Sequence, residues 1–334
     1  MKPSLPRTLP TCCLVALATC LTGCMPNGFL ITPVSTRREL AETTLRSDSF
    51  FARSKIAIID LDGVMTNARS SGLLGDGEHQ VSLLLEKPER AEHDDRVKAV
   101  ILRINSPGGT VTASELMHAE VQGFRRRSGK PVIAMMMDVA ASGGYYVACA
   151  CDEIVAHRST VTGSIGVVLQ LFEVTGTMAK LGVAGTTIKS GPHKAGGSPF
   201  EKMSDQDRAI FQGIIDALFD QFVAVVVAGR PDLDEQAVRK LADGRVYAAP
   251  QALEAGLIDS IANMRETVEA VKDRIGAANI RLVAYHRPLG YVPNYYARVD
   301  RLGRIGRGDI NIFKIEAPSW LRNGGARFMY LWLP

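Results

Sequence analysis

The chain has 334 residues, of which 46% are hydrophobic, 22% charged and 6% aromatic, and its formal net charge is +4. This length suffices for one large core or two modest ones, and the composition excludes a collagen, a coiled coil and a wholly disordered chain. The low net charge and the few aromatic residues also argue against a nucleic-acid-binding protein, which would show a basic bias or stacking platforms.

The first residues are typical of an export signal. Lys2 and Arg7 precede a mostly apolar stretch at 8–22, which is shorter than the roughly 20 residues that span a bilayer. Leu21-Thr22-Gly23-Cys24 then resembles a bacterial lipobox, in which a cysteine is lipidated and becomes the new N-terminus. Two acyl chains on that cysteine would give stable anchoring, where one chain does not.

We therefore interpret residues 1–23 as a lipoprotein-type signal peptide, Cys24 as the lipidation site and residues 24–53 as a tether. An ordinary signal peptide or an uncleaved anchor is the alternative. In each case we expect an exported protein held at a membrane, on the periplasmic or extracytoplasmic side.

The body of the chain alternates apolar runs with glycine-containing turns and helical patterns. This repeated strand–turn–helix order predicts an α/β fold with parallel strands. Pro88 lies inside the first helical pattern and could break it. In chain order, we expect strands at 54–61, 97–104, 131–137, 153–156, 165–169 and 185–190, and helices at 81–95, from 110 to about 128, from 142 onward and at 204–229.

Two cysteines lie in the body, Cys149 and Cys151. They are too close on one segment for a disulfide, and no further zinc ligands stand at suitable spacing, so we expect two buried thiols and neither metal nor cofactor. Residues 283–334 form a C-terminal extension with an apolar ending, which we expect to pack on the body, on a neighbouring subunit or at a lipid surface.

Ser142 is the first candidate catalytic residue, because it stands between a strand and a helix and small residues flank it on both sides. A helix N-cap is the competing interpretation. The segment Asn105-Ser106-Pro107-Gly108-Gly109 is a second strand-to-helix turn with paired glycines. The N–H groups of Gly109 and Gly143 could together bind an oxyanion beside the Ser142 hydroxyl.

A serine nucleophile needs a base. Lys194 stands among Gly, Pro and Ser residues, which places it on a shaped loop, and the Ser164 hydroxyl could help to orient its neutral amine. His157 is the alternative base, and Lys194 could also be an ordinary exposed lysine.

From Lys55 to Leu282 the chain resembles the bacterial signal peptide peptidase family (SppA, or protease IV) in its short form. Four segments carry the resemblance: 105–109, Asp138 to Tyr146, Thr162-Gly163-Ser164-Ile165-Gly166, and 190–199. It implies a crotonase-like (Clp-protease-like) fold built as a repeated ββα superhelix, with residues 54–282 as a serine peptidase domain.

The resemblance also assigns roles to the candidate residues. Ser142 would be the nucleophile, Lys194 the general base and Ser164 the lysine-orienting hydroxyl, with Gly109 and Gly143 as oxyanion donors. It implies homo-oligomers that cut hydrophobic peptides, including released signal peptides. Some relatives complete the dyad between subunits, and short forms are expected to complete it within one chain.

The sequence departs from the family pattern at two positions: Ala195 stands where an acidic residue is common, and Met137 where glycine is common. Three alternatives stay open. They are a membrane-protein peptidase of the related NfeD type, an acyl-CoA enzyme of crotonase type, and a non-catalytic lipoprotein scaffold. The export signal opposes the second, because coenzyme A is cytosolic.

Overall fold

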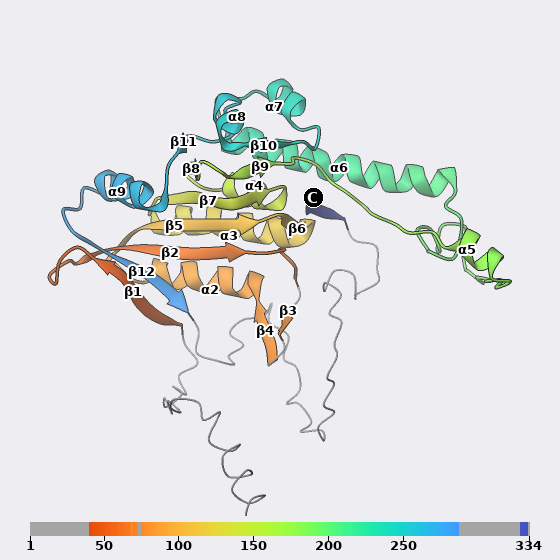
Figure 1. The fold of residues 1–334 in the computed structure, drawn as a ribbon, viewed down its shortest axis with the longest axis horizontal. Coiled ribbons are helices and arrows are strands. Elements are labelled where there is room, and N and C mark those ends of the chain that lie inside the picture. Colours follow the sequence, from red (N-terminus) through yellow and green to blue (C-terminus); the bar gives the residue numbers. More distant parts are fainter. Residues whose placement is uncertain (1–39, 68, 73–74, 287–327, 333–334) are drawn as a thin grey trace, which may run out of the picture. The chain divides into compact units, whose positions relative to one another are not determined.

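The computed structural model describes residues 40–67, 69–72, 75–286 and 328–332. Cys24 and the expected signal peptide lie outside these residues. In the described part, the largest sheet has nine strands in the order β1-β12-β2-β5-β7-β8-β11, while β9 pairs with β7 and β10 with β9 (Figure 1). These strands are β1 (Ala41–Ser47), β2 (Ser54–Asp62), β5 (Val97–Ser106), β7 (Val132–Ala141), β8 (Glu153–Ala156), β9 (Val161–Gly163), β10 (Val246–Ala248), β11 (Ser260–Ile261) and β12 (Ile280–His286).

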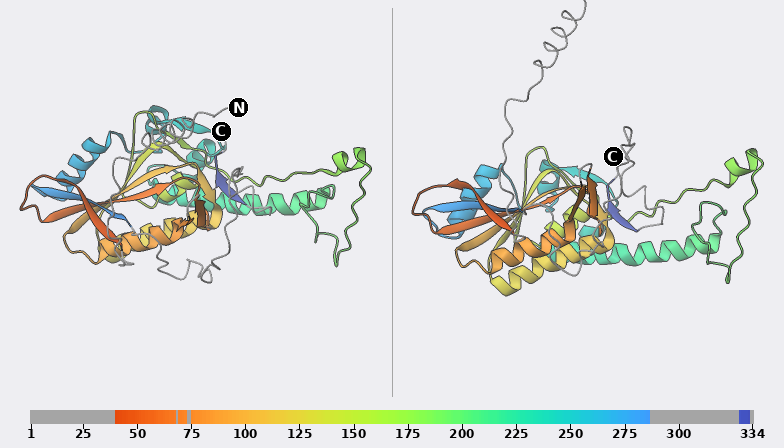
Figure 2. Two further views of the ribbon diagram at one scale, coloured as in Figure 1. Left: turned by 60° about the horizontal axis from the view of Figure 1, so that its bottom comes forward. Right: turned by 90° about the horizontal axis from the view of Figure 1, so that it is seen from below.

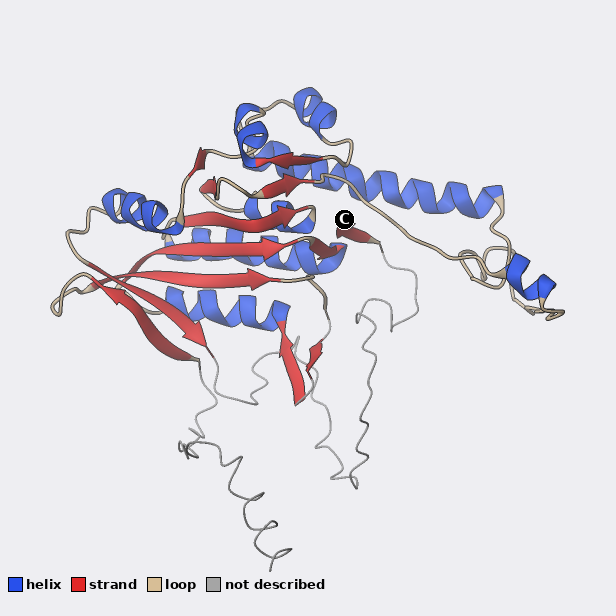
Figure 3. Ribbon diagram, in the orientation of Figure 1, coloured by secondary structure: helices blue, strands red, loops and turns tan. Residues whose placement is uncertain are grey.

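Two small sheets and a set of helices complete the described part (Figure 3). The small sheets pair β3 (Arg69–Gly72) with β4 (Gly75–His79) and β6 (Gly108–Thr110) with β13 (Met329–Leu331). The helices are α2 (Gln80–Glu92), α3 (Val111–Ser128), α4 (Gly143–Ala148), α5 (Thr175–Lys180), α6 (Asp205–Gly229), α7 (Glu235–Leu241), α8 (Ala249–Glu254) and α9 (Met264–Arg274).

The central strands are buried on both faces, which explains their near-continuous apolar sequences. β2, β5 and β7 pair in parallel, and helices cover both sides of them. α2 and α3 pack over one face, around Ile59, Leu102 and Phe124, whereas α9 packs over the other, around Ile58 and Ile133 (Figure 2). The predicted α/β class with parallel strands is therefore confirmed.

The predicted helix at 81–95 is present and is not broken at Pro88, because α2 runs through it from Gln80 to Glu92. An interior proline removes one backbone hydrogen bond. Pro88 is buried here, however, and the buried side chains of Leu84 and Ala91 on either side belong to the core beneath the helix. Packing of this apolar face outweighs the lost hydrogen bond.

Two of the predicted strands, at 165–169 and 185–190, are also absent from the structure. The strand in this region is β9, at Val161–Gly163, and it ends where the backbone turns at Gly163 and Ser164, both of which have positive φ. Val168 forms only an isolated bridge with Met329. The backbone after Ser164 therefore does not join the main sheet, although Ile165 is buried in the core.

β1 lies within the range that we interpreted as a tether. It pairs antiparallel with β12 at the edge of the main sheet, with Ala41 opposite His286. Beside it, the buried amine of Lys55 donates to Glu42 at 2.6 Å and to Asp94 at 2.8 Å. The sheet thus begins before residue 54 and ends after residue 282.

α6 has a buried root and an exposed end. Its root holds Phe222, Val223 and Val226, each at most 1% exposed, while Ile210 and Ile214 nearer its start are 46% and 39% exposed. In the described part, α6 is the one helix long and apolar enough to cross a membrane, with a mean hydropathy of 1.8. Since its root belongs to the core, the exposed part is an apolar surface that the chain itself leaves uncovered.

Arg230, which follows α6, anchors that root. Its guanidinium donates to the two carboxylate oxygens of Asp259 at 2.8 and 2.9 Å, and to the Gly256 carbonyl oxygen at 2.8 Å. Burial raises the pKa of Asp259, but hydrogen bonds from Arg230 and from the Ile154 N–H outweigh burial and hold this pKa below its ordinary 3.8.

Replacing Asp259 by Ala should lower the free energy of unfolding by about 2 kcal/mol, because it leaves the Arg230 guanidinium largely buried without its partner. A lowered carboxyl pKa contributes stability above pH 3.8 that is lost as the pH falls further. Denaturant unfolding at pH 7 and at pH 3 measures both effects. Asp243→Ala is the control, because its ion pair with Arg245 is exposed; equal losses in the two variants would contradict the anchor.

Candidate active site

Ser142 adopts a backbone conformation that non-glycine residues rarely adopt. It follows β7, precedes α4, and has φ 53° and ψ −116°. Within the described residues, only Ser142 and Ser164 combine a positive φ with a side chain. Such strain costs about 1–3 kcal/mol and persists where the surrounding structure enforces it, often at functional sites. Ser142 occupies the N-cap position of α4, but its side chain makes no capping hydrogen bond, so capping does not account for a serine here.

Strand pairing brings Ser142 and Ser164 together. β7 and β9 are parallel, and Ala141 lies opposite Gly163, so the two serines leave the same edge of the sheet as neighbours. The Ser142 N–H donates to the Gly163 carbonyl oxygen at 2.7 Å, and the Ser164 N–H donates to the Arg245 carbonyl oxygen at 2.8 Å. Ser142 is 1% exposed and Ser164 is 8% exposed. Backbone hydrogen bonds thus hold the two serine backbones next to each other at the end of two strands.

The two glycine-containing turns meet beside Ser142. Gly108 has φ 104°, and a Cβ atom there would lie 2.8 Å from the Gly143 nitrogen. The Ser106 hydroxyl fixes this turn, because it accepts from the Gly108 N–H at 3.1 Å and donates to the Gly63 carbonyl oxygen at 2.6 Å. The backbone of 108–109 and that of Gly143 therefore lie side by side, as the oxyanion hypothesis requires.

Gly109 has a packing reason of its own to be glycine. A Cβ atom there would lie 1.8 Å from the Met65 carbonyl oxygen, and Met65 forms a parallel bridge with Gly109. The Met65 N–H donates to the Gly108 carbonyl oxygen at 2.8 Å, and the Thr110 N–H donates back to Met65 at 2.9 Å. β6 is thus also hydrogen-bonded to the segment around Met65, a contact that the sequence did not predict.

Lys194 lies apart from this group. It is exposed, on a segment attached to the start of α6, where His193 Nδ1 is 2.7 Å from Asp207 Oδ1. Phe222, fifteen residues further along α6, packs on the Tyr146 ring with 5.1 Å between ring centroids. Fifteen helical residues span about 22 Å. The expectation that the dyad forms within one chain is therefore not met in this structure.

His157, the alternative base, is also distant from Ser142. Its N–H donates to the carbonyl oxygen of Met136, six residues before Ser142 on the same strand segment, which corresponds to roughly 20 Å. Its Nδ1 lies 3.1 Å from the Ser159 hydroxyl. The structure thus brings together Ser142, Ser164, Gly109 and Gly143, and leaves both candidate bases outside.

A cluster of aromatic side chains next to Ser142 was not found in the sequence. Tyr146, on α4, stacks on Tyr330 with 5.2 Å between centroids, and Phe222 contacts both rings. His118 meets the edge of Tyr146 at 5.1 Å, and burial lowers its pKa to about 4, which keeps it neutral. The motif around Tyr146 and the apolar C-terminal ending were visible in the sequence, but nothing in it indicated that they touch.

Cys149 and Cys151 are free and buried, as predicted. Burial raises the pKa of the Cys149 thiol to about 12 and that of Cys151 further. Neither thiol forms the reactive thiolate at neutral pH, so both act as small core residues.

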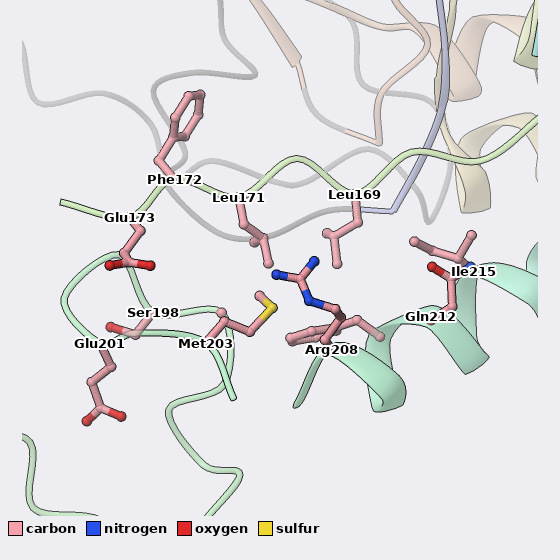
Figure 4. A pocket seen from close by; sticks show the side chains of 12 residues that line it. Leu169, Leu171, Phe172, Glu173, Ser198, Glu201, Met203, Arg208, Gln212 and Ile215 are labelled. Atoms are coloured by element: carbon pink, nitrogen blue, oxygen red, sulfur yellow. The ribbon is translucent and has the colours of Figure 1, made fainter. Parts of the chain in front are cut away.

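A separate cavity of about 410 Å³ lies between the exposed end of α6 and the segments at 169–173 and 197–203 (Figure 4). Figure 4 shows Leu171, Met203 and Arg208 pointing into it. It belongs to the region that carries Lys194, not to the Ser142 group.

Comparison with known proteins settles the family. The chain is 33% identical over 247 residues to a protein of Enterococcus faecium named as the signal peptide peptidase SppA, and the match covers 74% of this chain and 71% of that protein. The family model for peptidase family S49 matches residues 125–278. The chain belongs to this SppA family of serine peptidases. Its Clp-protease-like α/β fold follows from that membership, as the resemblance implied.

Other relatives are longer than the matched region. Protease 4 of Haemophilus influenzae is 33% identical over 230 residues, which are 69% of this chain but 36% of that protein. The chloroplastic serine protease SPPA of Arabidopsis thaliana is 31% identical over 264 residues, 78% of this chain and 38% of the relative. Among solved structures, the membrane-bound stomatin-specific protease 1510-N superposes with a TM-score of 0.43 at 17% identity, covering 66% of this chain and 80% of that one.

The strained backbone at Ser142 makes a direct prediction about stability. Ser142→Gly should be more stable than Ser142→Ala by about 1 kcal/mol, because glycine adopts this φ and ψ without the penalty that a Cβ atom imposes. Denaturant unfolding of both variants measures the difference. The same pair of substitutions at exposed Ser159 should show no gain for glycine. An alanine variant at least as stable as the glycine variant at position 142 would show that the site is not strained.

Proposed function

We propose that the protein is a membrane-anchored endopeptidase that uses Ser142 as nucleophile and Lys194 as general base to hydrolyse apolar, extended peptides such as released signal peptides. The observation that carries this proposal is the group of strained Ser142, neighbouring Ser164 and the backbone of 108–109 and Gly143 at one sheet edge. Family membership supplies the reaction class, because the relatives are named as proteases.

The proposed reaction proceeds through an acyl-enzyme. The neutral Lys194 amine accepts the Ser142 proton as the hydroxyl oxygen attacks the scissile carbonyl carbon, and the developing oxyanion accepts hydrogen bonds from the N–H groups of Gly109 and Gly143. Lys194 then donates the proton to the departing amine. A water molecule, deprotonated by the same lysine, releases the acyl group and restores Ser142. Removing one oxyanion donor would cost about 10²–10³ in rate.

We further propose that a second copy of the chain supplies Lys194. The segment that carries it and the start of α6 expose several large apolar side chains, a feature that marks interaction surfaces. They are Phe172, Leu181, Ile188 and Phe200, at 62%, 74%, 97% and 58% exposure. Docking these side chains on a neighbouring copy would bury them and bring Lys194 toward the neighbour's Ser142 and Ser164. A ring of such contacts would form a closed homo-oligomer.

Membrane attachment is proposed to occur through Cys24. The support is the lipobox-like segment at 21–24 after a short basic and apolar leader. A lipid anchor on the exported side would hold the peptidase where membrane-embedded apolar peptides are released. A lipoprotein scaffold without activity is disfavoured by membership in a peptidase family.

Mixing two inactive variants tests the dyad and its assembly together. Ser142→Ala and Lys194→Ala should each abolish cleavage of a quenched apolar peptide. Co-expression in equal amounts should restore about one quarter of the activity, because random assembly pairs an intact serine with an intact lysine at one interface in four. Lys202→Ala, an exposed lysine of the same segment, is the control and should stay active.

Two outcomes would contradict this account. Folded mixtures that recover no activity would show that serine and lysine act within one chain. Residual cleavage by Lys194→Ala or by Lys194→Arg would remove the lysine from the base role, since arginine does not lose its proton at usable pH.

A further inference from the structure

The turn between β1 and β2 exposes two adjacent phenylalanine rings. Phe50 and Phe51 are each 84% exposed, and their rings meet edge to face with 5.4 Å between the centroids. Single apolar side chains are common on protein surfaces. A pair of large aromatic rings at the tip of a turn is instead typical of a contact with an apolar partner.

Hydrogen bonds on both sides of the rings fix this turn. The Asp48 N–H donates to the Ile280 carbonyl oxygen at 3.0 Å, and the Asp48 carboxylate accepts from the Lys272 amine at 2.9 Å. The Arg281 guanidinium donates to the Phe50 carbonyl oxygen at 2.9 Å. Because the backbone is held at these points, the turn keeps both phenyl rings away from the core.

A basic cleft of about 750 Å³ lies at the same edge of the main sheet. It is formed where β5 and β7 begin and where α3 and α9 end, and the turn between β1 and β2 projects from this edge as well (Figure 1). Neighbouring strands lie about 4.8 Å apart, so about 15 Å separate β12, next to the turn, from β7. The charged residues that line the cleft are Lys98, Arg125, Arg126, Lys130 and Arg274, which are basic, and Asp152, which is acidic.

Three of these positive charges have no carboxylate partner. Lys98, Arg126 and Lys130 form no ion pair within the described part of the chain. The Lys130 amine instead donates to three backbone carbonyl oxygens at the end of α2 and just beyond it, at 2.7, 3.0 and 3.0 Å. Asp152, the acid in the lining, already pairs with Arg125. The excess positive charge of the cleft is therefore available to an anionic partner.

Two exposed aromatic rings beside a positive surface match the chemistry of an anionic membrane surface. Aromatic side chains insert at the level of the lipid headgroups, and Lys and Arg side chains attract the anionic phosphate groups. A second copy of the chain fits less well, because the apolar segment that we assign to contacts between copies, which includes α5, extends from the other end of the molecule (Figure 1).

We propose that this edge of the sheet docks on an anionic phospholipid surface, with the Phe50 and Phe51 rings among the headgroups and the basic cleft on phosphate groups. The contact is separate from the proposed lipid anchor at Cys24, whose link to Ala41 can extend to about 55 Å. β7 runs from this edge to Ser142 over about 30 Å. Docking therefore holds Ser142 away from the lipid, where it meets peptides that have left the membrane.

Fluorescence quenching on vesicles tests the insertion of the rings. The complete chain with Phe50→Trp is bound to vesicles of phosphatidylcholine and phosphatidylglycerol whose acyl chains are brominated. Bromine quenches tryptophan at short range, so the emission that the new tryptophan adds should fall at least twofold. Phe200→Trp, which replaces an exposed ring on the segment with Lys194, is the control and should keep its emission. Equal quenching at positions 50 and 200, or none at position 50, would overturn the proposal.

Charge reversal tests the cleft separately from the rings. In the same tryptophan variant, Lys98→Glu combined with Arg126→Glu should reduce the quenching at least threefold, because the carboxylates repel lipid phosphate. Lys240→Glu combined with Arg265→Glu changes the net charge equally, at two exposed residues outside the cleft, and should leave the quenching unchanged. Quenching that survives the first pair, or falls equally with both pairs, would overturn the proposal. Because neither experiment measures hydrolysis, both stand even if the proposed peptidase reaction proves wrong.

Discussion

The parallel pairing of β7 with β9 is the constraint on which the site depends. With Ala141 opposite Gly163, both strands end together, and a backbone hydrogen bond from Ser142 to Gly163 fixes the turn. Ser142 and Ser164 then take positive φ values, at a cost that the buried sheet must offset. The apolar burial of the central strands thus supplies the stability that the strained backbone at the candidate nucleophile Ser142 needs.

Close backbone contacts surround the turn that carries Ser142. Gly108 and Gly143 lie against each other and against the Tyr330 carbonyl oxygen. The surface next to Ser142 is therefore formed there by peptide backbone without side chains. Backbone of this kind suits extended chains of many sequences, because its hydrogen bonds do not depend on the partner's side chains. α6 reaches from the Ser142 region to the Lys194 region. Phe222 in its root packs against Tyr146, four residues after Ser142, while its exposed end lies next to the segment with Lys194.

Much of the fold was predictable from the sequence. The apolar runs at 54–61, 97–104 and 131–137 are core strands because a parallel sheet covered on both faces selects such runs. Residues 165–169 have the same composition but lie beyond a backbone turn, which periodicity does not detect. Pro88 shows that a local rule can lose to packing.

The site was predictable in its components and not in its assembly. The small residues around Ser142 and the resemblance to a family indicated Ser142 and Ser164, and the strand register of the structure places them next to each other. The position of Lys194 depends on an exposed, glycine-rich segment, where no burial pattern specifies direction. Contact of Tyr330 with Tyr146 joins distant parts of the chain, and no spacing in the sequence encodes it.

Covalent labelling measures the central claim most directly, namely that Ser142 is a nucleophile. The assembled protein is incubated with a peptidyl phosphonate that carries a tyrosine-like side chain, and the modified residue is identified by mass spectrometry. The account predicts a single adduct on Ser142, which is absent from Ser142→Ala. An adduct on another residue, or none on a folded and assembled protein, would contradict it.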